Sequence, residues 1–380
     1  MSSLEQLHFE HFGKTNVRYF QAPARINIIG EHVDYLGGLV LPAAIDFYTK
    51  ISISENKESE YRIYATQFEE TLKIPKITFQ KEKAWANYIL GVISEFEKLG
   101  HKVPFFDMVV SGNIPTGSGL SSSASLEVVV AYALNTLFGF GLDLKELALL
   151  AKRAENLFVG VNCGIMDQFA IAFGKQNHCI LLNTETLEYS YHLFDLGKFD
   201  FFLIKSSVKH ALNDGSYNAI RESCESALRK IQKDSPEIQF LYSLSEDFAK
   251  IYISLSDTER QRCEHVVGER KRTKQILDYF QSNQISSAGE LLTETHWSLS
   301  KLFQVSCKET DFIVEYAMEQ RSLGARMIGG GFGGCILVLD SIQNLEGWYP
   351  EFEKKYQRKF GLNPQLLKFK ICNGVSEIEN

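Results

Sequence analysis

The chain reads Pro115-Thr116-Gly117-Ser118-Gly119-Leu120-Ser121-Ser122-Ser123-Ala124 between an apolar segment at 105–111 and an apolar run that continues to about 138. These patterns predict a strand, a tight turn and a helix that begins at the serines. The glycines let the backbone approach a ligand closely, and the first helical turn offers unpaired N–H groups at its positive end. Serine hydroxyls add donors or a metal ligand. We therefore predict a polyphosphate-binding loop formed by Gly117, Ser118, Gly119, Leu120, Ser121, Ser122 and Ser123.

Other known phosphate-binding loops do not fit these residues. A P-loop needs Gly-Lys followed by Ser or Thr, and the segment has no such lysine. A dinucleotide-binding turn needs a third glycine where this chain has Ser122. The H-R-D and D-F-G motifs of protein kinases are absent as well. A plain glycine turn capped by serine remains possible as an interpretation, although three consecutive serines exceed what one cap requires.

The composition is typical of a globular enzyme with two lobes. A chain of 380 residues is longer than a domain with one ordinary hydrophobic core, so we expect two lobes that share a cleft. Apolar residues make up 44%, and no apolar run reaches the roughly 18 residues that span a bilayer, so we expect no membrane partner. The net charge of −7 and the lack of a dense Lys/Arg block argue against nucleic acid as a partner.

The N-terminal residues and the cysteines predict a cytoplasmic protein. The start of the chain lacks the basic stretch and apolar block of a secretory signal. The seven cysteines are scattered and never spaced as C-x-x-C, which indicates free thiols in a reducing compartment. We expect the chain to act as a monomer.

Strand patterns give way to helix patterns along the chain. Residues 17–80 alternate apolar and polar side chains, as an antiparallel sheet does, and a helical period over 84–99 follows. Beyond about residue 195 the sequence is typical of an α+β unit. We expect helices over 121–138, 145–159, 215–232, 259–281, 286–303 and 308–320, a glycine-rich hairpin at 324–339 and a last strand near 366–372.

Three segments resemble the galactokinases, a branch of the GHMP kinases that phosphorylate galactose, homoserine, mevalonate and phosphomevalonate. The first is Ala22-Pro23-Ala24-Arg25-Ile26-Asn27-Ile28-Ile29-Gly30-Glu31-His32-Val33-Asp34-Tyr35-Leu36-Gly37-Gly38, which resembles the galactokinase signature. It departs from the usual residues at Ala24, Val33 and Leu36. The loop at 115–124 resembles the second GHMP motif. The third is matched by Gly324-Ala325-Arg326-Met327-Ile328-Gly329-Gly330-Gly331-Phe332-Gly333-Gly334-Cys335.

The resemblance covers almost the whole chain and implies an α+β, two-lobed GHMP kinase fold. Residues 1–195 would form an N-terminal ribosomal-S5-like α/β lobe with the galactose signature and the phosphate loop. Residues 196–380 would form a C-terminal ferredoxin-like α+β lobe with the glycine-rich third motif. The implied activity is transfer of the terminal phosphate of ATP to the C1 hydroxyl of galactose, with Mg²⁺ as cofactor.

The resemblance also implies roles for single residues. Asp167 matches the proposed base that takes the proton of the C1 hydroxyl, and Arg25 matches the arginine that lies against this aspartate and the moving phosphoryl group. Without the resemblance, Asp167 could be a helix cap and Arg25 a surface ion-pair residue. The implied sugar-binding residues are Arg25, Glu31, His32, Val33, Asp34, Gly164, Asp167 and Tyr217. Near Tyr217 the match weakens, because Ile220 stands where the family often has arginine.

Ser123 and Glu155 match the residues that hold Mg²⁺ in the family, although a glutamate on a helix is also commonly solvated. Trp85 and Tyr88 share the spacing of one helix face and could line an adenine pocket or belong to the core. The run from Glu31 to Asp34 contains metal-ligand types, but no second His/Asp cluster has a matching spacing. We expect it to bind sugar hydroxyls instead.

Two other functions stay open from the sequence. One is a related kinase for N-acetylgalactosamine or another hexose, which would differ in the room beside the sugar C2 hydroxyl. The other is a galactose sensor that binds both ligands without turnover. Such sensors lack a Ser-Ala pair in the phosphate loop, whereas this chain has Ser123-Ala124.

Overall fold

Six strands form the first sheet. They are β1 (Arg18–Asn27), β3 (Pro42–Glu55), β4 (Tyr61–Ala65), β5 (Glu70–Ile74), β6 (Phe106–Gly112) and β13 (Ser376–Ile378). The computed structural model describes residues 3–208, 214–245 and 254–379. In the strand order β13-β1-β3-β6-β4-β5, all neighbours are antiparallel except the parallel pair β4 and β6. The antiparallel pairing predicted over 17–80 is therefore confirmed for β1 with β3 and for β4 with β5.

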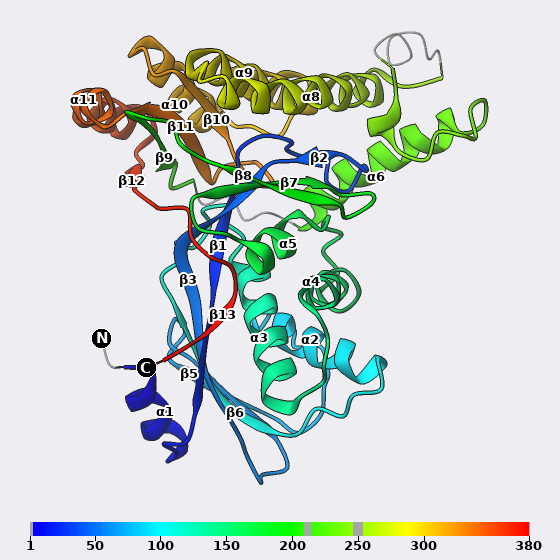
Figure 1. Cartoon of the computed structure of the whole chain (residues 1–380), viewed down its shortest axis with the longest axis vertical. Helices are drawn as coiled ribbons and strands as arrows, with labels where there is room; N and C mark the ends of the chain where they lie inside the picture. The colour runs from blue at the N-terminus through cyan, green and yellow to red at the C-terminus, as the bar shows by residue number, and fades with distance from the viewer. Residues whose placement is uncertain (1–2, 209–213, 246–253, 380) are drawn as a thin grey trace.

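Helices cover one face of this sheet (Figure 1). They are α2 (Ala86–Lys98), α3 (Ser122–Phe138), α4 (Leu144–Arg153) and α5 (Met166–Phe173). Helix α3 packs against β1 and β3 and is largely buried, because its sequence is almost continuously apolar. Helix α1 (Leu4–Phe12) lies on the opposite face, where His8 hydrogen-bonds Ser52 and Ser54 of β3.

The helix predicted over 145–159 changes geometry partway along. Helix α4 begins at a capping box of Asp143 and Glu146, and after Arg153 the chain continues as a π-helical turn, η1 (Ala154–Val159). Gly160, at φ 93°, ends this turn. Single π-helical turns inside helices are frequent at functional sites, and this one contains Glu155.

A second, four-stranded antiparallel sheet has the order β10-β11-β9-β12. Its strands are β9 (Phe199–Lys205), β10 (Gly324–Met327), β11 (Cys335–Ser341) and β12 (Gln365–Leu367). The helices of this half are α6 (Asp214–Ile231), α8 (Asp257–Gln281), α9 (Ile285–Ser298), α10 (Lys308–Glu319) and α11 (Ile342–Phe360), with the short turns η2 (Leu241–Ser243) and η3 (Leu299–Phe303). A small third sheet pairs β7 (His178–Asn183) with β2 (Leu39–Val40) and β8 (Tyr189–Leu193).

The C-terminal end of the chain differs from the expected single strand near 366–372. It forms β12, an isolated bridge between Ile371 and Ile45, and then β13, which returns to pair with β1 (Figure 1). All strands of the second sheet follow residue 195, as the predicted lobe boundary requires. Strand β13 also follows residue 195 but belongs to the first sheet. The division into lobes 1–195 and 196–380 therefore stays a proposal. In the described part of the chain, no helix combines the length and apolar character needed to cross a membrane.

Helix α9 and strand β10 approach so closely that only glycine fits between them. A Cβ on Gly324 would lie 2.2 Å from the carbonyl oxygen of Gly289. We expect Gly324→Ala to lower the free energy of unfolding by about 2–3 kcal/mol, because backbone on both sides must move. Urea denaturation measures this loss. The matched control is Gly347→Ala on exposed α11, where a Cβ meets no atom within 4 Å and the change should stabilise by roughly 0.5–1 kcal/mol. Equal stability of the two variants would contradict the packing argument.

Candidate active site

The centre of the candidate site is a two-pronged ion pair between Arg25 and Asp167. Arg25 Nε and Nη2 donate to the two carboxylate oxygens of Asp167 at 2.7 and 2.8 Å. Asp167 lies in the first turn of α5, and Arg25 follows an irregularity in the β1–β3 register between Pro23 and Ala24. Such a bulge redirects the side chains that follow it. The arginine is buried, while the aspartate side chain keeps 26% of its exposure, so one of its edges remains open to a substrate.

The phosphate loop is attached to this pair at two points. Arg25 Nη1 donates to the carbonyl oxygen of Gly119 at 2.6 Å, and the Ser121 hydroxyl donates to Asp167 Oδ2. Ser121 has left-handed backbone angles, φ 61° and ψ 49°, and its side chain does not cap helix α3. The sequence suggested a serine cap, but this hydroxyl bonds Asp167 instead. The N–H groups of the first turn therefore receive no cap from Ser121 and point to the N-terminal side of α3.

The remaining loop residues fall into two groups. Gly117 and Gly119 adopt positive φ angles of 67° and 73°, whereas Ser118 and Leu120 are buried. The third motif packs on the loop, since a Cβ on Gly329 would lie 2.8 Å from the Gly119 carbonyl oxygen. Backbone rather than side chain therefore forms the junction between the two motifs.

A buried acidic pair lies beside the loop. Gln168 Nε2 donates to Glu155 at 2.7 Å and to Glu127 at 3.2 Å, and the Ser123 hydroxyl hydrogen-bonds Glu155. Burial, together with the charge of Asp167, raises the pKa of Glu155 to about 7. Burial and the neighbouring Glu155 also raise the pKa of Glu127.

Sequence reasoning named Ser123 and Glu155 but missed Glu127 and Gln168. The sequence held one clue to Glu127. It stands four residues after Ser123 and therefore shares a helix face with it. Within the described residues, neither glutamate forms an ion pair with a lysine or arginine. Both glutamates therefore hold their protons more tightly than usual in this structure, and a bound cation would favour their charged forms.

The residues of the galactose signature line the other side of the ion pair. Asp34 accepts a hydrogen bond from the Met166 backbone N–H and lies so close to Gly164 that a Cβ there would meet Asp34 Oδ2 at 1.9 Å. Burial, followed by the charges of Asp167 and Glu31, raises the pKa of Asp34 to about 7. Glycine at 164 is thus the only residue that leaves room for this carboxyl group.

Aromatic rings surround His32 in the same region. His32 has φ 59°, and its Nδ1 lies 2.9 Å from the Tyr35 hydroxyl. The Tyr217 ring centre is 5.7 Å from that of His32 and 5.9 Å from that of Tyr35. Burial, followed by the charge of His265, lowers the pKa of His32 to about 3, so the imidazole is neutral near pH 7. The Val33 side chain belongs to the core.

Trp85 and Tyr88 occupy the start of α2, with Trp85 directly before the helix. The Trp85 ring stacks on Phe68 at 5.4 Å, and the adjacent Gln67 donates to the Thr116 hydroxyl at the start of the phosphate loop. Tyr88 is partly buried against the core. Of the two predicted adenine residues, Trp85 therefore stands near the start of the loop, whereas Tyr88 packs against the core.

Comparisons with known proteins identify the class of this fold and site. The chain matches the N-terminal domain of GHMP kinases over residues 87–175, the C-terminal domain of GHMP kinases over 276–344, and the galactokinase galactose-binding signature over 6–55. The matches cover the phosphate loop, the third motif and the sugar signature in turn. The predicted α+β GHMP kinase fold is confirmed.

Proteins that are similar along the full length of the chain identify the branch of the GHMP kinases to which it belongs. A galactokinase of Thermosipho africanus is 41% identical over 360 residues, covering 94% of this chain and 99% of the relative, and one of Clostridium tetani is 39% identical over 384 residues, covering 100% and 98%. The crystal structure of Lactococcus lactis galactokinase complexed with galactose superposes with a TM-score of 0.94 at 33% identity over 99% of both chains. The chain belongs to the galactokinase family.

The raised pKa of Asp34 makes a prediction about stability and pH. In the unfolded chain this carboxyl group ionises near its ordinary value, so between about pH 4 and 7 the folded state binds the extra proton and loses stability as the pH rises. We expect Asp34→Asn to be at least about 1 kcal/mol more stable than the wild type at pH 8, with a smaller gain at pH 5.5. Denaturant titrations at both pH values measure this, with Asp143→Asn at the exposed cap of α4 as control. A gain that is the same at both pH values would contradict the assignment.

Proposed function

We propose that this protein transfers the terminal phosphoryl group of ATP to the C1 hydroxyl of galactose, giving galactose 1-phosphate and ADP. The observation that carries the proposal is the Arg25–Asp167 pair, which contacts the phosphate loop through Gly119 and Ser121 and lies against the sugar signature at Asp34. Donor and acceptor would therefore meet at this pair. The full-length similarity to galactokinases supports galactose as the acceptor.

Asp167 is the proposed base. Phosphoryl transfer needs positioning, charge neutralisation and at most one proton acceptor, since the bonds change at phosphorus. With one oxygen bonded by Arg25 and the other by Arg25 and Ser121, the carboxylate has a fixed orientation, and its exposed edge would accept the proton of the sugar hydroxyl. The Arg25 guanidinium would neutralise charge that develops on the transferred group.

Sugar recognition is assigned to the residues on the far side of Asp167. Glu31, His32 and Asp34 would bind hydroxyl groups, and the bare backbone at Gly164 and the Tyr217 ring would contact the sugar face. The main chain of Val33 is included, since its side chain is in the core. The α3 N-terminus would bind the ATP phosphates, and Trp85 and Tyr88 would line the adenine pocket.

The donor set beside the loop fits Mg²⁺. Ser123 and Glu155 supply oxygen ligands, which this cation prefers, and the paired glutamates lack a protein cation among the described residues. When bound, the ion would neutralise charge on the ATP phosphates. Few protein ligands suffice, because Mg²⁺ keeps phosphate oxygens and waters in its shell. The monomeric state and the cytoplasmic location stay proposals that rest on the sequence alone.

A hexose panel tests the proposed function. With Mg²⁺-ATP, we expect galactose to give more ADP than N-acetylgalactosamine, glucose or 2-deoxygalactose, followed by a coupled assay. Asp167→Asn should lower kcat by about 10²–10⁴ without loss of galactose binding, because one acceptor oxygen for Arg25 remains. Binding of both ligands without ADP release by the wild type would instead indicate a sensor, and preference for another sugar would refute galactose.

The metal assignment makes a separate prediction. Glu155→Gln removes the charged ligand, so the Mg²⁺ concentration that gives half-maximal rate should rise at least about tenfold at fixed ATP. Direct titration with Mn²⁺, followed by its paramagnetic resonance signal, gives a second readout. Glu185→Gln in an exposed turn is the matched control. An unchanged metal requirement in the Glu155 variant would remove this residue from the metal site.

A further inference from the structure

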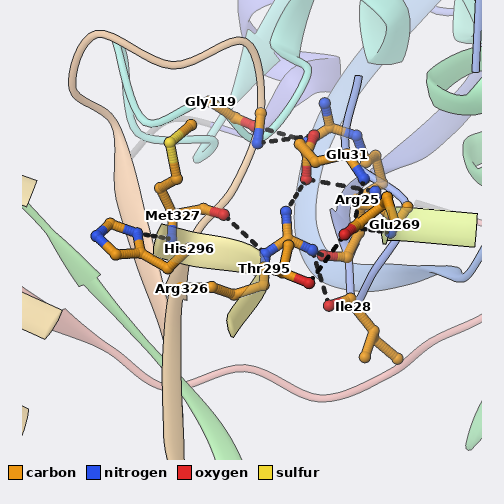
Figure 2. A network of polar contacts seen from close by, with 12 residues as sticks. Arg25, Ile28, Glu31, Gly119, Glu269, Thr295, His296, Arg326 and Met327 are labelled. Atoms are coloured by element: carbon orange, nitrogen blue, oxygen red, sulfur yellow. Dashed lines mark hydrogen bonds and ion pairs between the residues drawn. The ribbon is translucent and has the colours of Figure 1, made fainter. Parts of the chain in front are cut away.

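Arg326 of the third motif reaches from the second sheet to the end of β1. It is a fully buried residue on β10, yet it carries a charge. Its Nη1 donates to the carbonyl oxygens of Ile28 and Asn27 at 2.8 and 3.3 Å, and its Nη2 forms an ion pair with Glu31 (Figure 2). Its Nε donates to its own neighbour Met327 at 2.9 Å. One guanidinium thus holds the strand and the carboxylate that follows it.

Glu31 is held from several other directions by the C-terminal half. Gly329 N–H donates to its Oε1 at 3.1 Å, and Glu269 of α8 accepts from the Gly30 and Glu31 N–H groups at 2.8 and 3.3 Å. His265 Nε2 lies 3.2 Å from the Glu31 carbonyl oxygen. Figure 2 shows Glu31 between Arg25 and Arg326, with Glu269 beside it. Main chain and side chain of Glu31 are therefore both fixed.

Stability alone does not account for this buried pair. Burial raises the pKa of Glu31, and the charges of Arg326 and Arg25 oppose that shift. Ions that leave water recover their hydration energy only through good geometry, and apolar residues of similar size commonly stabilise a core as well. What the pair supplies beyond stability is direction, because Nη1 anchors the rigid guanidinium plane to the end of β1 while Nη2 holds Oε2 of Glu31 at a fixed place beside it.

We propose that Arg326 is a positioning residue for the sugar site and acts through Glu31. It holds the Glu31 carboxylate in the orientation that binds sugar hydroxyls, without itself contacting the sugar. This inference rests on the proposed function, in which Glu31 is a galactose ligand. Arg326 also lies two and three residues before Ile328 and Gly329, which pack on the phosphate loop, so its effect must be separated from an effect on ATP.

The test is Arg326→Lys. This change keeps the positive charge and removes the guanidinium, whose separate nitrogens bond the end of β1 and Glu31. We expect the KM and the calorimetric Kd for galactose to rise at least about tenfold, while the KM for ATP changes less than about twofold. Arg62→Lys is the control for the loss of a guanidinium–carboxylate ion pair, since Arg62 donates to Asp107 at 2.6 and 2.8 Å far along the first sheet. It should lower the melting temperature and leave both KM values unchanged. If folded Arg326→Lys binds galactose as the wild type does, the inference is wrong.

A double-mutant comparison covers the case in which Arg326→Lys does not fold. Glu31→Gln and Glu31→Gln with Arg326→Met should have galactose Kd values within about twofold of each other, because Arg326 has no carboxylate left to orient. A larger difference would show that Arg326 acts by another route and would overturn the inference. Failure of the wild type to phosphorylate galactose would instead refute the proposed function, so the two failures are distinguishable.

Discussion

The candidate site depends on one contact, the two-pronged bond between Arg25 and Asp167. It joins the C-terminal end of β1 to the first turn of α5, and the same guanidinium reaches the carbonyl oxygen of Gly119. Without that guanidinium, Asp167 would face the carboxyl groups of Asp34 and Glu155 without its own ion-pair partner. The pair therefore sets both the geometry of the phosphate loop and the charge balance of the site.

Four buried carboxyl groups surround this pair. Glu31 and Asp34 lie on the side proposed for the sugar, and Glu127 and Glu155 lie on the side proposed for the metal. Burial raises the pKa of each of these carboxyl groups. The two sides differ in their ion pairs. Arg326 pairs with Glu31, whereas Glu127 and Glu155 form no ion pair with a lysine or arginine among the described residues. A bound cation would serve the second side and accompany the nucleotide.

The sequence predicted the strands of the first sheet other than β13, the loop and most helices, because apolar periodicity and glycine spacing are local signals. Helix α11 was missed, since Gly347 and Pro350 lie inside it and both normally interrupt helices. The Arg25–Asp167 contact followed from the family resemblance rather than from pattern. The bond from Ser121 to Asp167, and the grouping of Gln168 with Glu127, depend on how distant segments pack, which a single sequence does not encode locally.

The return of β13 to the first sheet links the order of synthesis to the completion of the fold. Residues 376–378 pair with Tyr19, Phe20 and Gln21, so this edge of β1 keeps unpaired backbone groups until those later residues have been synthesised and have docked. An open edge invites pairing with other chains. The strand that carries Arg25 is thus open to association along this edge for as long as β13 is not in place.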